Sequence, residues 1–311
     1  MLLTDNYLIP NNLTDALKAL SEAPEGTKVV SGATDLLPWS RQGRAGDIAG
    51  DVKVPMVVDI SKIEELNGWG TEPDGWLRLG ASLKIQDFLE DQVLARHMPH
   101  MPECAVWFAD DQIRRQATLA GNVVNASPAA DTIPPLLTLD AEVECVGLEN
   151  GGLKHRRIPI SVFISGPGKT ILNPGEIVSS IYCRSASGYG GSFQKVGHRR
   201  SLVISTVCAA ALVKPSVKDH LFEDVRLAFG GIAKVPVRAI ELEDYLIGRP
   251  MNLEIVEEAS ILTSDYVASR TRIDYRRDVV AGFAKRSILW AASEAGYSLE
   301  TESPSLETAD G

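Results

Sequence analysis

The sequence lacks most features that mark nucleic-acid-binding, membrane or secreted proteins. It has 31 Lys and Arg against 41 Asp and Glu, which gives a formal net charge of -10. A chain this acidic does not suit a polyanion, so we expect no nucleic-acid partner. No apolar run reaches about twenty residues, so no membrane span is expected. The N-terminus, MLLTDNYLIPNNLTDAL, has no basic region before an apolar stretch and is not expected to be a signal peptide. We therefore expect a cytoplasmic protein.

Cysteine and histidine are scarce and scattered. The four cysteines, Cys104, Cys145, Cys183 and Cys208, form no CxxC pair, and the five histidines show no HExxH spacing. Metal and cluster ligands usually recur at short, fixed spacings, so we expect no metal site and buried structural thiols instead. GxSxG, a GxGxxG after a strand and GxxxxGK[ST] are also missing. We therefore predict no catalytic residue, no Rossmann fingerprint and no P-loop on this chain.

The composition is that of a globular protein, with 44% hydrophobic and 23% charged residues over 311 positions. This length allows two or three domains. The first half alternates between helical and strand patterns, whereas strands and then helices follow a loop or linker at 167–174. We expect helices at 13–20 (capped by Asn11 or Asn12), from Ser82 over 83–90 and from 101, and strands at 27–30, 56–60, 76–81 and 141–147.

After the linker, strands are expected at 176–183, 190–196, 202–213 and 225–231, and helices at 237–248, 253–269 and 276–296. Residues 41–54 are interpreted as a surface loop, because Gly, Asp and Arg dominate them. The fold class is α+β. We expect a first domain at 1–175, with subdomains at about 1–55 and 56–175, a second domain at 176–295 and a polar tail at 296–311.

Two stretches of small and hydroxyl-bearing residues suggest a binding site. They are VVSGATDLL at 29–37 and RRQATLAGNVVNASPAAD at 114–131. Small side chains leave backbone N–H groups open to an anion, while Thr34 and Asn122 add polar side chains. Either stretch taken alone also suits a structural turn, with Thr34 or Asp35 capping the first and Ser127 the second. If the two stretches meet in space, they could hold the pyrophosphate of a dinucleotide from both sides.

Five segments in order identify a family. They are SGATDLL, WFADDQIRRQATLAGNVVNASPAADTIPPLLTLDAEVE, SFQKVGHRRS, VRLAFGGIAKVPVRA and RRDVVAGFAKRSIL, within about residues 5 to 293. Together they resemble the FAD-binding (medium) subunit of the molybdenum hydroxylases, the xanthine dehydrogenase and carbon monoxide dehydrogenase flavoproteins. The resemblance implies a PCMH-type FAD-binding domain of two α/β subdomains. A C-terminal α+β domain with an antiparallel sheet and helices would follow.

The resemblance also implies which residues bind FAD. One cradle for the pyrophosphate would comprise Val30, Ser31, Gly32, Ala33, Thr34, Asp35 and Leu36, and a second Thr118, Gly121 and Asn122. Phe108 and Ala109 would lie beside the adenine or ribose, Asp131 and Val178 would contact FAD, and Lys195 would lie near the flavin. Judged by the residues alone, Lys195 suits a surface lysine as well. Ala33 and Ala120 stand where relatives favour Gly or, at 33, Asn, so we expect both at φ below zero.

The function implied by the resemblance is electron transfer within a larger enzyme. Electrons would pass from a large molybdopterin subunit, through two [2Fe–2S] clusters of a small subunit, to FAD on this chain and then to an external acceptor. We expect a dimer of such heterotrimers, with patches on this chain exposed for its partners. Two alternatives remain open: a stand-alone FAD oxidoreductase of similar fold, and a flavin-free scaffold subunit.

Overall fold

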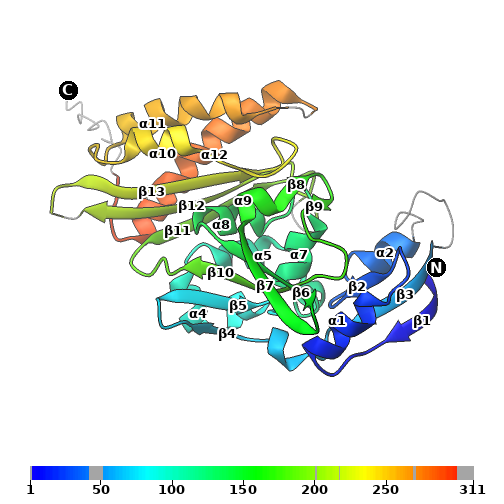
Figure 1. Ribbon diagram of the computed structural model, residues 1–311. Coiled ribbons are helices and arrows are strands. Elements are labelled where there is room, and N and C mark those ends of the chain that lie inside the picture. The colour runs from blue at the N-terminus through cyan, green and yellow to red at the C-terminus, as the bar shows by residue number, and fades with distance from the viewer. Residues whose placement is uncertain (1, 42–51, 200–201, 217, 269–270, 300–311) are drawn as a thin grey trace, which may run out of the picture.

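The N-terminal part of the chain forms a small parallel sheet with its helices (Figure 1). The computed structural model describes residues 2–41, 52–199, 202–216, 218–268 and 271–299. The sheet has the order β1 (Leu2–Leu8), β3 (Val52–Asp59), β2 (Lys28–Val30), with α1 (Leu13–Ser21) and α2 (Leu36–Arg41) in the connections. The Asn12 side chain accepts a hydrogen bond from the Asp15 amide, which confirms the predicted cap. Residues 52–54 belong to β3 rather than to the expected loop, and 42–51 lie outside the described residues.

A five-stranded antiparallel sheet forms the centre of the molecule. Its order is β4 (Trp69–Thr71), β5 (Trp76–Gly80), β10 (Ile177–Arg184), β6 (Glu142–Glu149), β7 (Gly152–Pro159). Short helices link these strands: η1 (Glu64–Leu66), α3 (Asp87–Glu90), α4 (Gln92–His97), α5 (Met101–Trp107), α6 (Asp111–Arg114), α7 (Leu119–Asn125), α8 (Ile133–Thr138) and α9 (Ile160–Phe163). The small hairpin of β8 (Ile164–Gly166) and β9 (Lys169–Thr170) precedes β10. Because β10 is the middle strand, this sheet continues past the boundary that we expected at 175.

The C-terminal part is an antiparallel sheet covered by helices on its outer face (Figure 1). The order is β11 (Gly190–Val196), β12 (Val207–Ser216), β13 (Leu221–Gly230), β14 (Val237–Arg238), followed by α10 (Ile240–Leu246), α11 (Leu253–Ile261), η2 (Leu262–Tyr266) and α12 (Ile273–Glu294). The helix expected at 253–269 ends at 261 and continues as a 3-10 turn, and β12 begins at 207 rather than 202. Residues 300–311 of the expected tail lie outside the described ranges.

Strand β12 joins the central part of the chain to the C-terminal part, because it contributes side chains to the hydrophobic core of each. Cys208, Ala210 and Leu212 belong to the large core shared with the central part of the chain. The alternate residues, Ala209 and Ala211 among them, pack in a second core with the C-terminal helices. A strand that is buried on both faces needs apolar side chains at successive positions, and VCAAALV supplies them.

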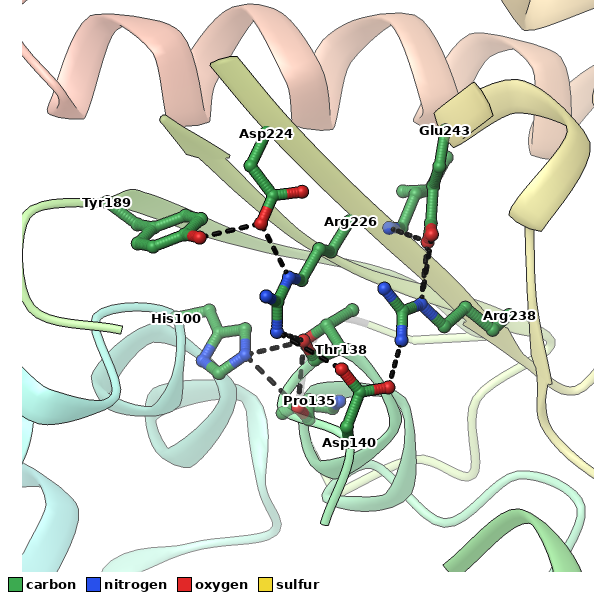
Figure 2. Close-up of polar contacts among 10 residues, drawn as sticks. His100, Pro135, Thr138, Asp140, Tyr189, Asp224, Arg226, Arg238 and Glu243 are labelled. Carbon is green, nitrogen blue, oxygen red and sulfur yellow. Dashed lines mark hydrogen bonds and ion pairs between the residues drawn. The ribbon is translucent and has the colours of Figure 1, made fainter. Parts of the chain in front are cut away.

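A polar network joins the halves at their surface (Figure 2). Asp140, just beyond α8, pairs with Arg226 of β13 and Arg238 of β14. The second carboxylate on each arginine comes from the C-terminal part itself: Asp224 lies 2.9 Å from Arg226, and Glu243 lies 2.9 Å from Arg238. The two arginines therefore link an acid of the central part to acids of the C-terminal part.

Candidate functional site

A cavity of about 420 Å³ lies where the two small-residue stretches meet. Twelve of the fifteen residues predicted to bind the cofactor line it: Val30, Ser31, Gly32, Ala33, Thr34, Asp35, Leu36, Phe108, Thr118, Gly121, Asn122 and Val178. The nearest ends of the stretches, residues 37 and 114, are 77 positions apart in the sequence, so the fold brings them together. The volume falls within the range of about 300–1,000 Å³ that is usual for cofactor sites.

The first stretch forms the turn between β2 and α2. Ala33 adopts a φ of 51°, so our expectation of a negative φ at this position was wrong. The αL conformation lets the chain turn sharply, which is why Gly or Asn would suit position 33. A Cβ atom on Gly32 would lie 2.1 Å from the Gln116 carbonyl oxygen. Glycine is therefore required at 32 so that the two stretches can touch.

The second stretch is partly helical, which corrects our interpretation of it as a loop. Thr118 is the N-cap of α7, and its Oγ1 accepts a hydrogen bond of 3.1 Å from the Gly121 amide. Ala120 lies inside this helix, so its φ is negative as expected. The Asn122 Oδ1 accepts a 2.7 Å hydrogen bond from the Thr132 hydroxyl. This bond uses the acceptor of the amide and leaves its N–H donors for a ligand.

A third segment, residues 81–85, connects the two stretches and was missed from the sequence. We expected a helix capped by Ser82 over 83–90, but only Asp87–Glu90 is α-helical. The Ser82 Oγ lies 3.4 Å from the Ser31 Oγ of the first stretch. On its other side, the segment bonds to the second stretch through three backbone pairs: Leu119 N to Leu83 O, Ile85 N to Ala117 O and Ala120 N to Ala81 O. The small residues GAS after β5 were the available signal.

The charged side chains that line the cavity do not carry enough positive charge to neutralise a bound anion. Among the described residues that line it, Lys28 is the one cation, and Asp35 and Glu176 are the carboxylates. Burial raises the pKa of Asp35. Burial also acts to raise the pKa of Glu176, but hydrogen bonds from Arg156 and Asn173 outweigh it and hold that pKa below its usual value.

The three remaining predicted residues, Ala109, Asp131 and Lys195, do not line the cavity. The Lys195 Nζ lies 2.6 Å from Asp131 and donates to the Trp107 carbonyl at 3.1 Å. The Lys195 side chain is 3% exposed, so the surface-lysine interpretation was wrong. Asp131 also accepts a 2.6 Å hydrogen bond from Ser205, while burial raises the Asp131 pKa and Lys195 opposes the rise. The contacts that the resemblance gives these three residues with FAD stay predictions.

The described part of the chain contains neither a cluster of metal ligands nor a helix that could span a membrane. No group of three or more His, Cys, Asp or Glu side chains there could hold a metal ion. No helix within the same residues is both long and apolar enough to cross a membrane. All four cysteines are buried and free.

The fold and the cavity define an α+β protein with a candidate cofactor site, lined by glycines, hydroxyls and an amide on two facing stretches. Residues 3–183 match the model of the FAD binding domain in molybdopterin dehydrogenases, and residues 192–291 match the CO dehydrogenase flavoprotein C-terminal domain. The chain belongs to the FAD-binding subunits of the molybdenum hydroxylases, and it is an oxidoreductase subunit.

Similar proteins cover nearly the whole chain. The putative xanthine dehydrogenase FAD-binding subunit of Escherichia coli K12 is 30% identical over 93% of this chain and 96% of its own length. The glyceraldehyde dehydrogenase medium chain of Sulfolobus acidocaldarius is 28% identical over 88% and 94%.

Solved structures share the fold. A carbon monoxide dehydrogenase from Hydrogenophaga pseudoflava has a TM-score of 0.83 at 22% identity, covering 93% of this chain and 97% of that one. Quinoline 2-oxidoreductase from Pseudomonas putida 86 has 0.82 at 23%, covering 94% and 98%.

The residues present fit FAD as the cofactor. The Thr34 hydroxyl and the Asn122 amide place neutral side-chain donors on the lining, and neutral donors suit a pyrophosphate. Phe108, Val178 and Leu172 give the cavity apolar walls of a kind that suits flat rings. FAD is therefore the cofactor of this chain.

Proposed function

We propose that this chain is the electron-transfer subunit of a molybdopterin hydroxylase. Electrons would arrive from the [2Fe–2S] clusters of a small partner subunit, which a large molybdopterin subunit reduces. When bound, FAD supplies the redox chemistry by accepting these electrons and passing them to an external acceptor. The observation that carries the proposal is the cavity itself, where two small-residue stretches meet within a fold of this family.

The roles of this chain's own residues would be to bind and orient. The turn at Gly32 and Ala33 and the start of α7 would present backbone N–H groups to the phosphates. Thr34 and Asn122 would add side-chain donors. No proton transfer on this chain is required, which agrees with a sequence that offers no acid–base pair for one.

The partners would dock on exposed apolar surface. Strand β1 is an edge strand, and Leu3, Tyr7, Leu8 and Ile9 on it and just after it are 40–52% exposed. Ile204, at 79%, is the most exposed large apolar side chain among the described residues. Exposed apolar side chains of this size suit contact with another subunit. We propose a dimer of heterotrimers in the cytoplasm as the working assembly.

Expression of the chain alone gives the first test. A noncovalent flavin spectrum, with FAD released on denaturation and no iron–sulfur absorption, is expected. Tagged chain should also capture the [2Fe–2S] and molybdopterin subunits when the three are produced together. FAD without such capture would favour the stand-alone oxidoreductase, and a folded chain that takes up no FAD would favour the scaffold subunit.

An Asn122→Ala variant tests the site. The loss of the amide donors should weaken FAD binding to the apoprotein by about 1–3 kcal/mol, the usual range for a buried polar group left without its partner. Flavin fluorescence titration measures the dissociation constant. Asn67→Ala, at an exposed position away from the cavity, is the control and should bind FAD as the wild type does. Unchanged affinity in a folded Asn122→Ala variant would remove Asn122 from the site.

A further inference from the structure

Lys84 lies directly behind the point where the two stretches meet. Its Nζ donates a 3.3 Å hydrogen bond to the carbonyl oxygen of Gln116. The same oxygen lies 2.1 Å from the position that a Cβ on Gly32 would occupy. The Lys84 backbone also pairs with Thr118, the N-cap of α7. The Lys84 ammonium therefore contacts the second stretch at the oxygen that lies against Gly32 of the first stretch.

The Lys84 ammonium forms no ion pair with a carboxylate of the described residues. No Asp or Glu of the described residues lies within 4.0 Å of the Lys84 Nζ. The two acids whose charges attract the Lys84 ammonium, Asp87 and Asp59, act from beyond 4.0 Å. Asp87 accepts from the Lys84 backbone amide at 2.8 Å, and Asp59 accepts from the Tyr7 hydroxyl at 2.6 Å.

A half-buried ammonium whose close partner is a neutral carbonyl carries a desolvation cost in the free protein. Burial lowers the pKa of Lys84, which is the direction expected when desolvation opposes the charged form. The described lining of the cavity offers an anionic ligand one cation, the exposed Lys28, together with the carboxyls of Asp35 and Glu176. A phosphate bound between the two stretches would attract the Lys84 ammonium. The ammonium would in turn offset part of the negative charge of the phosphate.

We propose that Lys84 is an electrostatic positioning residue that attracts the phosphates of FAD into the cradle from behind. The inference rests on the proposed FAD site, and it concerns charge rather than direct contact. It assigns a binding role to the 81–85 segment, which also holds Ser31 through Ser82. The attraction acts through partly buried protein, so it is stronger than that of an exposed lysine at a similar distance.

The test measures FAD binding to apoprotein over a series of KCl concentrations for wild type, Lys84→Met and Lys84→Arg. Lys84→Met should weaken binding about tenfold at low salt, in line with one charge acting at short range in partly buried protein. The deficit should shrink as KCl rises, and Lys84→Arg should restore most of the affinity. Lys62→Met removes an exposed lysine and matches the change in net charge, so it should behave as the wild type does. Thermal melts of each apoprotein establish that the variants are folded, and Lys84→Gln replaces Lys84→Met if that variant does not fold.

The outcomes separate the two proposals. Wild-type apoprotein that binds no FAD would contradict the site itself. If the wild type binds FAD and Lys84→Met binds equally well, the role of Lys84 is refuted while the site stands. A loss that is independent of salt and that arginine does not rescue would also overturn the inference, because it would indicate support of the loop rather than charge.

Discussion

Two glycines show how differently the same residue is used. A Cβ on Gly32 would lie 2.1 Å from the Gln116 oxygen, whereas a Cβ on Gly282 in α12 would meet no atom within 4 Å. Gly282→Ala should therefore stabilise the protein by about 0.5–1 kcal/mol, since glycine is the poorer helix former. Gly32→Ala should destabilise it, because a backbone carbonyl would have to move.

Urea unfolding of the two variants measures both effects. A side chain larger than that of alanine at 32 would act on the protein before it acted on a ligand. It would first push the two stretches apart on the protein side, so a loss of FAD from such a variant would not by itself locate the pyrophosphate. Equal stability of Gly32→Ala and wild type would contradict the close contact.

Asp35 gives a pH-dependent prediction at the residue scale. Burial raises its pKa in the folded protein, so the folded state holds this proton more tightly than the unfolded state does. The ionised carboxyl therefore destabilises the apoprotein increasingly as pH rises from about 4, the usual Asp value. Asp35→Asn should raise the melting temperature of the apoprotein at pH 7, and the gain should vanish below about pH 4.

The control for Asp35→Asn is Asp278→Asn, at an exposed position of α12. Thermal melts of both variants from pH 3.5 to 8 carry the test. A gain that is the same at every pH would point to packing rather than ionisation.

At the scale of elements, the sequence predicted segments with a regular apolar pattern well and short segments poorly. The strand at 190–196 and the cap of α1 are where the pattern placed them, because periodicity and capping are local signals. Only the second half of the expected helix over 83–90 forms, at Asp87–Glu90. The first residues of the expected helix pair instead with the second stretch, and such long-range pairing leaves no local mark.

The candidate site, like the elements, was predicted in part: local patterns marked some of its features and left others hidden. The two stretches that line the cavity stood out through their small residues and their resemblance to a family. The αL conformation of Ala33 could not be predicted, since an αL alanine has no signal in the sequence. The burial of Lys195 was also hidden, because its partner Asp131 lies 64 positions earlier in the chain.

For the whole molecule, the buried pair of Asp131 and Lys195 joins the central part to the C-terminal sheet. The Lys195 and Asp131 side chains are 3% and 10% exposed, and Ser205 binds the second Asp131 oxygen. Removing one partner would leave a buried charge uncompensated, so Asp131→Asn or Lys195→Met should each cost about 3–5 kcal/mol of unfolding free energy.

The double variant distinguishes a pair from two independent contributions. The Asp131→Asn and Lys195→Met double variant should lose less unfolding free energy than the sum of the two single losses, because neither buried charge is then left unpaired. The difference, which is the coupling energy of the pair, is expected to be about 1–3 kcal/mol. Urea unfolding of the four proteins completes the cycle. The exposed pair of Lys53 and Asp5, at 66% and 57%, serves as the comparison, and Lys53→Met should cost at most about 1 kcal/mol. Strictly additive losses at 131 and 195 would mean that the two side chains support the junction separately, and the halves would then be held by their shared apolar core rather than by this ion pair.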